Sequence, residues 1–147
     1  MKVREIMNKD VISVKSESTV HEIVKLMYEK KVSGLPVVDD DNKVIGIVSK
    51  SDLVQKVSGP HLPAHLQILG SIIYLKTPHE MDEEFKKAVA QRAGEIMTEH
   101  PVTVGQDEEV ENTANIMVEK KINRIPVTEK GKLVGIITRD DIIKSMI

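Results

Sequence analysis

The chain has 147 residues, enough for one domain or two very small ones, and its charged (30%) and hydrophobic (40%) fractions are ordinary for a globular protein. A net charge of −2 gives no electrostatic footprint for nucleic acid or an anionic membrane, and without cysteine there are neither disulfides nor thiolate chemistry. No apolar run approaches the length of a membrane span and no apolar signal core follows Met1, so we expect a cytoplasmic protein that binds neither nucleic acid nor membrane.

Most of the chain consists of two similar halves. Glu5-Ile6-Met7 recurs as Glu95-Ile96-Met97, and residues 27–37 recur as residues 117–127 with six identities in eleven positions. The offset between the copies is 97 − 7 = 90 residues. It falls to 135 − 46 = 89 after residues 39–42, because that polar turn is one residue longer in the first half.

Each half is expected to form a strand, a helix, two strands and a short helix. An apolar stripe at Val20, Ile23, Val24 and Met27 predicts the first long helix, which a capping box of Thr19 and Glu22 would begin. Asp107 is expected to cap its counterpart, and the prolines at 36 and 126 favour edge strands or strand starts. The predicted elements are strands 11–14, 34–38, 43–48, 101–104, 124–127 and 132–137, with short helices at 51–57 and from 140 to the C-terminus.

A longer connection, residues 59–92, joins the halves. Thr77-Pro78-His79-Glu80 predicts a helix start, with the helix reaching about Ala93. An apolar cluster precedes it, at Leu66, Ile68, Leu69, Ile72, Ile73 and Leu75. The cluster could pack on its own module, cover a ligand as a lid, or form a homodimer surface, and we favour the homodimer.

A seven-residue motif occurs in both halves. Gly46-Ile47-Val48-Ser49-Lys50-Ser51-Asp52 matches Gly135-Ile136-Ile137-Thr138-Arg139-Asp140-Asp141. Each copy is an apolar strand that reaches a hydroxyl where a helix should begin, with a carboxylate three positions later. Helix N-termini attract phosphate and a carboxylate can bind ribose hydroxyls, so the motif favours a ribose-phosphate site. The alternative is a capping box that needs no ligand.

The doubled motif, the Glu-Ile-Met segments and the strand prolines, in this order and spacing, resemble a tandem pair of CBS domains (named for cystathionine β-synthase), also called a Bateman module. The resemblance implies an α+β fold of two β-α-β-β-α motifs packed with pseudo-twofold symmetry. A half of this size is too small to bury an adequate core alone, so we expect one shared module. The expected parts are residues 1–58, the linker arm 59–92, and residues 93–147.

Modules of this kind bind adenosine-containing ligands in clefts between the halves. Carried over, the resemblance places phosphate at Ser49 and Thr138 and ribose hydroxyls at Asp52 and Asp141. Backbone around the first strand and the proline strand would read the adenine edge, while aliphatic side chains clasp its faces. The candidate ligand-binding residues are Val11, Ile12, Ser33, Gly34, Leu35, Pro36, Ser49, Ser51, Asp52, Pro101, Val102, Ile122, Asn123, Arg124, Ile125, Pro126, Thr138, Arg139 and Asp141.

The two candidate sites are not equivalent. The first half has Ser33-Gly34 where the second has Asn123-Arg124, and a guanidinium suits phosphate oxygens. In modules that the chain resembles, a basic residue at this place can contact phosphate; the alternative is a solvated surface cation. The resemblance therefore implies a stronger site with Thr138, Asp141 and Arg124, and a weaker one with Ser49 and Asp52.

The sequence contains no motif for catalysis. It has neither a glycine-rich phosphate loop nor a nucleophile motif, so we expect no enzyme, no catalytic cofactor and no metal site. The leading hypothesis is a regulatory module that binds an adenine nucleotide such as AMP, ADP or ATP and signals to an unidentified effector protein. The rival is a ligand-independent scaffold whose motifs only cap helices.

Overall fold

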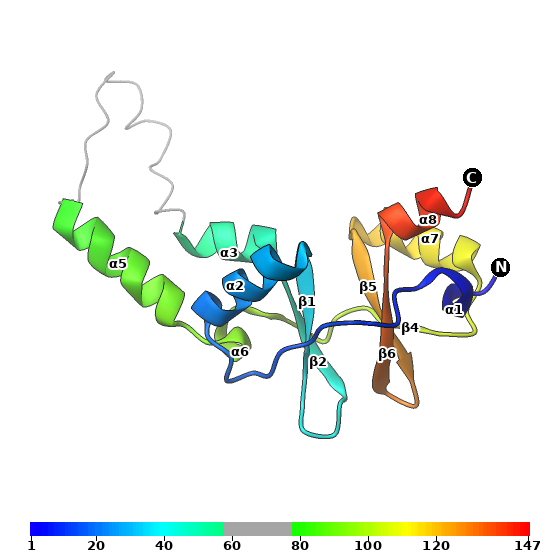
Figure 1. Cartoon of the computed structure of the whole chain (residues 1–147), viewed down its shortest axis with the longest axis horizontal. Helices are drawn as coiled ribbons and strands as arrows, with labels where there is room; N and C mark the ends of the chain where they lie inside the picture. The colour runs from blue at the N-terminus through cyan, green and yellow to red at the C-terminus, as the bar shows by residue number, and fades with distance from the viewer. Residues whose placement is uncertain (58–77) are drawn as a thin grey trace, which may run out of the picture.

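The computed structural model describes residues 1–57 and 78–147. Two three-stranded sheets stand side by side in the middle of the molecule, and helices lie on their outer sides (Figure 1). The strand order is β1-β2-β3 in one sheet and β4-β5-β6 in the other. This is the α+β arrangement of two similar halves that the repeat predicts.

The elements follow the repeat in chain order. The first half contains α1 (Val3–Ile6), α2 (Val20–Lys30), β1 (Gly34–Val38), β2 (Val44–Ser49) and α3 (Lys50–Val57). Helix α5 (Pro78–Ala90) precedes the second half, which contains α6 (Ala93–Ile96), β3 (Thr98–Glu99), β4 (Val104–Gly105), α7 (Val110–Lys120), β5 (Arg124–Glu129), β6 (Lys132–Thr138) and α8 (Arg139–Lys144).

The local signals that the sequence carries are largely confirmed. Thr19 and Glu22 form the expected capping box at the start of α2, with both hydrogen bonds at 3.2 Å. Helices α2 and α7 end at equivalent lysines, Lys31 and Lys121, in the left-handed conformation. Strands β1 and β2 pair as an antiparallel hairpin, and β5 and β6 pair in the same way.

Several expectations at the ends of elements are wrong. Residues 11–14 form only a single bridge, from Val14 to Val37, and the predicted strand 101–104 is reduced to the two residues of β4. Asp107 does not cap α7, whose N-cap is Glu109; Asp107 pairs with Arg4 instead. Helix α8 stops at Lys144, before the C-terminus.

The proline of the second half is also placed differently from the prediction. Strand β5, which contains Pro126, is the central strand of its sheet. Neighbouring β4 pairs only with Val127 and Thr128. Because β4 stops short of Pro126, the missing N–H of this proline interrupts no ladder there.

The two halves exchange their first segments. Val3 and Met7 belong to the hydrophobic core of the second half, together with Ile125 and Ile137. Ala93 and Ile96 belong to the core of the first half. Asn8 bridges to Ile136, and β3 adds to β2 through the pairs Gly46↔Glu99 and Ile47↔Thr98. Each core is therefore completed by residues from the other half of the chain.

Helix α5 leaves the body of the molecule on the side of the first half and contacts α2 and α3 (Figure 1). Its Ala88 is buried, whereas Phe85 is 57% exposed. The apolar cluster of residues 66–75 lies outside the described residues, so its role stays a prediction. In the described part of the chain, the helices are all too short or too polar to span a bilayer.

Candidate functional site

Both copies of the seven-residue motif form the predicted strand-to-helix junction. Strand β2 ends at Ser49 and α3 begins at Lys50, while β6 ends at Thr138 and α8 begins at Arg139. The hydroxyl residue thus occupies the last strand position in each half, and the carboxylate lies one turn into the helix.

In each junction the carboxylate folds back onto the hydroxyl residue. Oδ2 of Asp52 accepts hydrogen bonds from the backbone N of Ser49 at 2.8 Å and from its Oγ at 2.9 Å. Oδ2 of Asp141 accepts the same two bonds from Thr138, at 2.8 and 2.7 Å. Oδ1 of each carboxylate accepts no hydrogen bond from the residues that the structure describes. The predicted capping box is therefore present, and it leaves one carboxylate oxygen open to a ligand.

The first junction, at Ser49 and Asp52, opens into a cleft between the halves. The cleft has a volume of about 340 Å³, within the range of about 300–1,000 Å³ that small-molecule sites occupy. The first half contributes the β2–α3 junction and the second contributes two segments, residues 98–102 and 121–126. The lining residues are Ile47, Ser49, Ser51, Asp52, Thr98, His100, Pro101, Val102, Lys121, Ile122, Asn123, Arg124 and Pro126.

The cleft combines apolar walls with one charged end. Pro101, Val102 and Ile122 supply aliphatic surface. Arg124 and Lys121 are cationic and Asp52 is anionic, so the fixed charges sum to +2 − 1 = +1. Ser51 Oγ lies 2.9 Å from Ser49 Oγ, which adds a second hydroxyl beside the start of α3. This arrangement suits a flat apolar group that carries hydroxyls and a phosphate.

Arg124 is half-buried and crosses from one half to the other. Its Nη2 donates a hydrogen bond of 2.7 Å to Ser33 Oγ. Burial lowers the pKa of the Arg124 guanidinium, and the negative charge of nearby Asp52 acts in the opposite direction. Among the described residues, no carboxylate lies within ion-pair distance of Arg124. The cleft thus contains a partly desolvated cation whose charge is not neutralised.

A comparison with family sequence models identifies the family of this chain. The sequence model of the CBS domain matches residues 3–59 and 93–147, which is most of the chain. The chain belongs to the CBS domain family. The two matched segments contain both motif copies, and together they supply all the residues that line the cleft.

Similar proteins match over nearly the whole chain. The protein MJ1426 of Methanocaldococcus jannaschii, uncharacterized, is 31% identical over 157 residues, covering 100% of this chain and 92% of its own length. The chloroplastic CBSX1 of Arabidopsis thaliana is 34% identical over 148 residues, and this chain spans 63% of its length. The crystal structure of Arabidopsis thaliana CBSX2 in complex with AMP matches with a TM-score of 0.75 and 30% identity, covering 99% of this chain and 95% of that one.

The predicted grouping of the site residues is wrong in one respect. The sequence assigns Arg124 to a site with Thr138 and Asp141, but its side chain lines the cleft with Ser49 and Asp52. The reason is that the Arg124 side chain extends across the boundary between the halves towards Ser33. The candidate site that contains Arg124 is consequently the one built on the first motif.

The predicted residues that do not line the cleft lie in the cores, beside Arg124 or at the second junction. Leu35 and Ile125 belong to the two hydrophobic cores, and Pro36 is also fully buried. Val11 and Ile12 are partly buried, and Ile12 packs against the first core. Ser33 and Gly34 contact Arg124. Thr138, Arg139 and Asp141 stay at the second junction and do not line this cleft.

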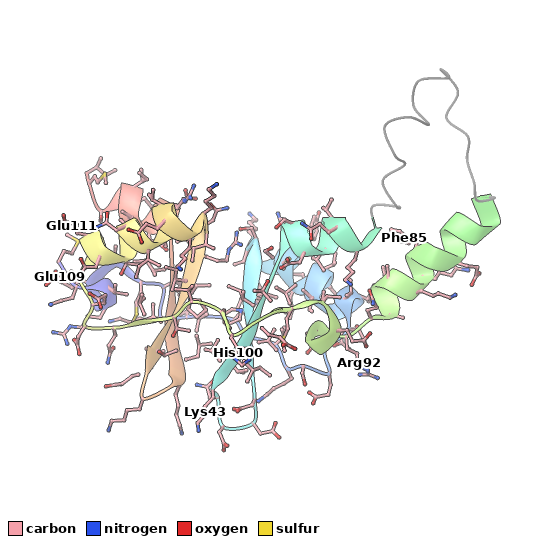
Figure 2. The ribbon with its side chains drawn as sticks, turned by 180° about the vertical axis from the view of Figure 1, so that it is seen from behind. Lys43, Phe85, Arg92, His100, Glu109 and Glu111 are labelled. Carbon is pink, nitrogen blue, oxygen red and sulfur yellow. The ribbon has the colours of Figure 1, made fainter. Side chains whose placement is uncertain are left out.

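Sequence reasoning missed four lining residues, namely Ile47, Thr98, His100 and Lys121. Ile47 faces Thr98 across the β2–β3 pairing, which joins segments 51 residues apart and has no local signal. His100 lies in the segment that runs between the two sheets (Figure 2). Lys121 was identifiable only as one of a pair of helix-end lysines, which are usually solvated.

A second hollow, of about 430 Å³, lies at the outer end of the second half. Its lining is mainly the loop 105–109, with Lys2, Thr128 and Glu129. Asp107 and Glu109 already form ion pairs with Arg4, Lys2 and the N-terminal amine. Since the lining has four carboxylates, Asp107, Glu108, Glu109 and Glu129, against the single cation Lys2, this hollow does not suit a phosphate ligand.

Proposed function

We propose that this CBS pair is a non-enzymatic sensor that binds an adenine nucleotide in the cleft lined by Ser49, Asp52 and Arg124. The observation that carries the proposal is that the first motif and two cationic residues of the second half, Lys121 and Arg124, line the same cleft. The AMP complex of the similar CBSX2 supports the ligand class.

The polar end of the cleft would bind the ribose and phosphate. Phosphate oxygens would accept from Ser49, from the N-terminal backbone of α3 and from Arg124. Oδ1 of Asp52, which has no partner among the described residues, would accept from the ribose hydroxyls. The adenine would lie between Pro101, Val102 and Ile122, which suits a chain with only three aromatic residues.

Paired alanine variants test the site. Asp52→Ala removes the ribose acceptor and is expected to weaken AMP binding about tenfold or more, because a buried ligand hydroxyl loses its charged partner. Asp141→Ala is the matched control, since it removes the same cap hydrogen bonds at the junction that does not line the cleft. Calorimetric titration of AMP gives the affinities, and equal losses in both variants would contradict the assignment.

The ligand itself is identified by a thermal-shift panel of AMP, ADP, ATP, S-adenosylmethionine and NAD. A ligand at one hundred times its Kd stabilises the folded state by about 2.7 kcal/mol, which raises Tm measurably. The scaffold alternative is supported by the closed capping boxes at both junctions. A panel without any shift would favour it.

We also propose that the sensor acts in the cytoplasm as a homodimer that signals to an effector protein. Exposed apolar side chains on the outer helices of both halves support a contact with a second copy. A sensor of this kind works only if the nucleotide binds one conformation better than another, so the effector must distinguish those conformations.

A further inference from the structure

Ser33 and Gly34 of the first half hold the Arg124 side chain of the second. Ser33 Oγ accepts the 2.7 Å hydrogen bond from Arg124 Nη2. A Cβ atom placed on Gly34 would lie 2.6 Å from Arg124 Nε and 2.9 Å from Cζ, so the arginine rests directly on the glycine backbone. Any side chain at position 34 would displace it.

Ser33 also joins Arg124 to the first motif. The carbonyl oxygen of Ser33 accepts a 3.0 Å hydrogen bond from the backbone N of Lys50, the first residue of α3. One residue thus fixes the guanidinium and the helix start beside Ser49. The guanidinium and the start of α3, which come from different halves of the chain, are thus both hydrogen-bonded to Ser33.

The guanidinium retains free capacity for an anion. Only one of its five N–H donors is engaged by Ser33 in the described structure. Burial without an ion-pair partner makes an incoming phosphate the natural counter-charge, since a half-buried cation gains more from an anion than a solvated one does.

We propose that Ser33 and Gly34 form a seat that positions Arg124 for the phosphate of a nucleotide in the Asp52 cleft. This inference rests on the proposed function and adds two positioning residues to it. Phosphate specificity then belongs to a unit of three residues from both halves, and not to Arg124 alone.

The seat also limits the number of phosphate sites. Ser33 and Gly34 are the repeat counterparts of Asn123 and Arg124, at offsets of 123 − 33 = 90 and 124 − 34 = 90. They would therefore line the equivalent cleft of the second junction. Because the Arg124 side chain already occupies that corner, each chain binds one phosphate-bearing nucleotide.

The test compares AMP with adenosine, which lacks the phosphate, in the full chain. Arg124→Ala is expected to weaken AMP about 10- to 100-fold and to leave adenosine within about twofold. Ser33→Ala is expected to weaken AMP about two- to tenfold. Gly34→Ala, which forces Arg124 off its seat, should approach the loss of Arg124→Ala. Calorimetry should give one AMP per wild-type chain.

Double variants separate positioning from a general structural effect. In the Arg124→Ala background, Ser33→Ala and Gly34→Ala should leave AMP affinity unchanged within about twofold, because no side chain remains to be seated. Gly34 does not require positive φ, so alanine fits its backbone. Thermal unfolding of each variant confirms that the fold persists.

Three outcomes overturn the inference. The first is that AMP binds, but Ser33→Ala and Gly34→Ala weaken adenosine as much as they weaken AMP, or weaken AMP as much in the Arg124→Ala background as in the wild type. In either case the pair does not act through the guanidinium. If two AMP molecules bind per wild-type chain, the seated arginine does not block the second corner. If the wild type binds neither AMP nor adenosine, the proposed function fails together with the seat.

Discussion

Each Glu-Ile-Met segment ends in a methionine that packs on a strand glycine of the opposite half. A Cβ at Gly135 would lie 2.6 Å from Met7 Sδ, and a Cβ at Gly46 would lie 2.8 Å from Met97 Cγ. The Glu-Ile-Met segments and the glycine that begins each seven-residue motif, which both support the resemblance in the sequence, therefore contact each other in the structure. Glycine is required because the methionine occupies the space of a side chain, and not because of the backbone angle.

The two glycines are predicted to differ in their tolerance of alanine. A Cβ at Gly135 also meets the carbonyl oxygen of Asn8 at 3.0 Å, and that carbonyl is bonded to Ile136 N. At Gly46 the three nearest atoms all belong to the Met97 side chain, which can move. Gly135→Ala should cost about 1–3 kcal/mol of unfolding free energy, and Gly46→Ala less.

Urea unfolding of the two alanine variants measures this difference, with the m-value checked for constancy. The double variants Met7→Ala/Gly135→Ala and Met97→Ala/Gly46→Ala complete two cycles. Truncating the methionine should relieve most of the clash at position 46, where only the Met97 Cβ remains, at 3.1 Å. It should relieve less at position 135, where the Asn8 carbonyl oxygen remains at 3.0 Å. Equal losses at both glycines would contradict the role of the Asn8 carbonyl.

At the scale of elements, ion pairs fix the exchanged N-terminal segment to the second half. Lys2 Nζ donates to Glu109 Oε1 at 2.5 Å, and the N-terminal amine lies 3.3 Å from Oε2 of the same residue. Arg4 pairs with Asp107 at 2.6 Å. Figure 2 shows Glu109 at the outer end of the second half, where solvent weakens each pair.

These contacts predict a loss of stability in acid. The hydrogen bond from Lys2, followed by that from the N-terminal amine, lowers the pKa of Glu109 from its usual 4.5. A carboxyl with a lower pKa in the folded state contributes stability above about pH 4.5, which is lost as pH falls through the folded value. Glu109→Gln should therefore flatten the fall of Tm between pH 7 and pH 3.

The matched control for the pH experiment is Glu111→Gln, an exposed position that forms no ion pair with described residues. It should leave the pH dependence of Tm close to that of the wild type. Glu17 and Glu108 also have lowered pKa values, so Glu109→Gln removes only part of the slope. Identical curves for Glu109→Gln and the wild type would show that the segment is held by its backbone contacts alone.

The elements that sequence predicted best are those whose signals are local. Strand β1, helix α2 and both strand-to-helix junctions follow from periodicity, capping residues and the repeat. The short helices α1 and α6 and strand β3 were missed, because they are formed by contacts with the other half. The sequence predicted the type of site, a cleft between the halves that holds a ribose and a phosphate. It did not predict where the Arg124 side chain lies, because that side chain crosses from one half to the other and an alignment of the repeats does not show such a crossing.

The exchange of segments also qualifies the division of the chain. Residues 1–58 and 93–147 are proposed as the two repeat units, with 59–92 as the connecting arm. Val3 nevertheless lies in the core of the second unit, and Ala93 lies in the core of the first. Neither unit should fold alone, because cutting the chain between them removes core residues from both.

At the scale of the whole molecule, apolar side chains are exposed at equivalent places in both halves. Tyr28 on α2 corresponds to Val118 on α7, since 118 − 28 = 90, and they are 86% and 71% exposed. Val54 on α3 and Ile143 on α8 are 62% and 61% exposed, with an offset of 143 − 54 = 89. Helices α3 and α8 lie at the end of the molecule away from the hairpin turns (Figure 1).

This repetition predicts an isologous homodimer through the outer helices. A twofold axis would bring both apolar helix pairs of one chain against those of a second copy, which buries all four side chains. Light scattering at micromolar concentration should give twice the chain mass. Tyr28→Glu and Val118→Glu should each shift the population to monomer, while urea unfolding of the monomer changes by about 0.5 kcal/mol or less because the positions are exposed. Glu111→Gln, also on α7, should leave the mass unchanged, and a wild type that stays monomeric would exclude this assembly.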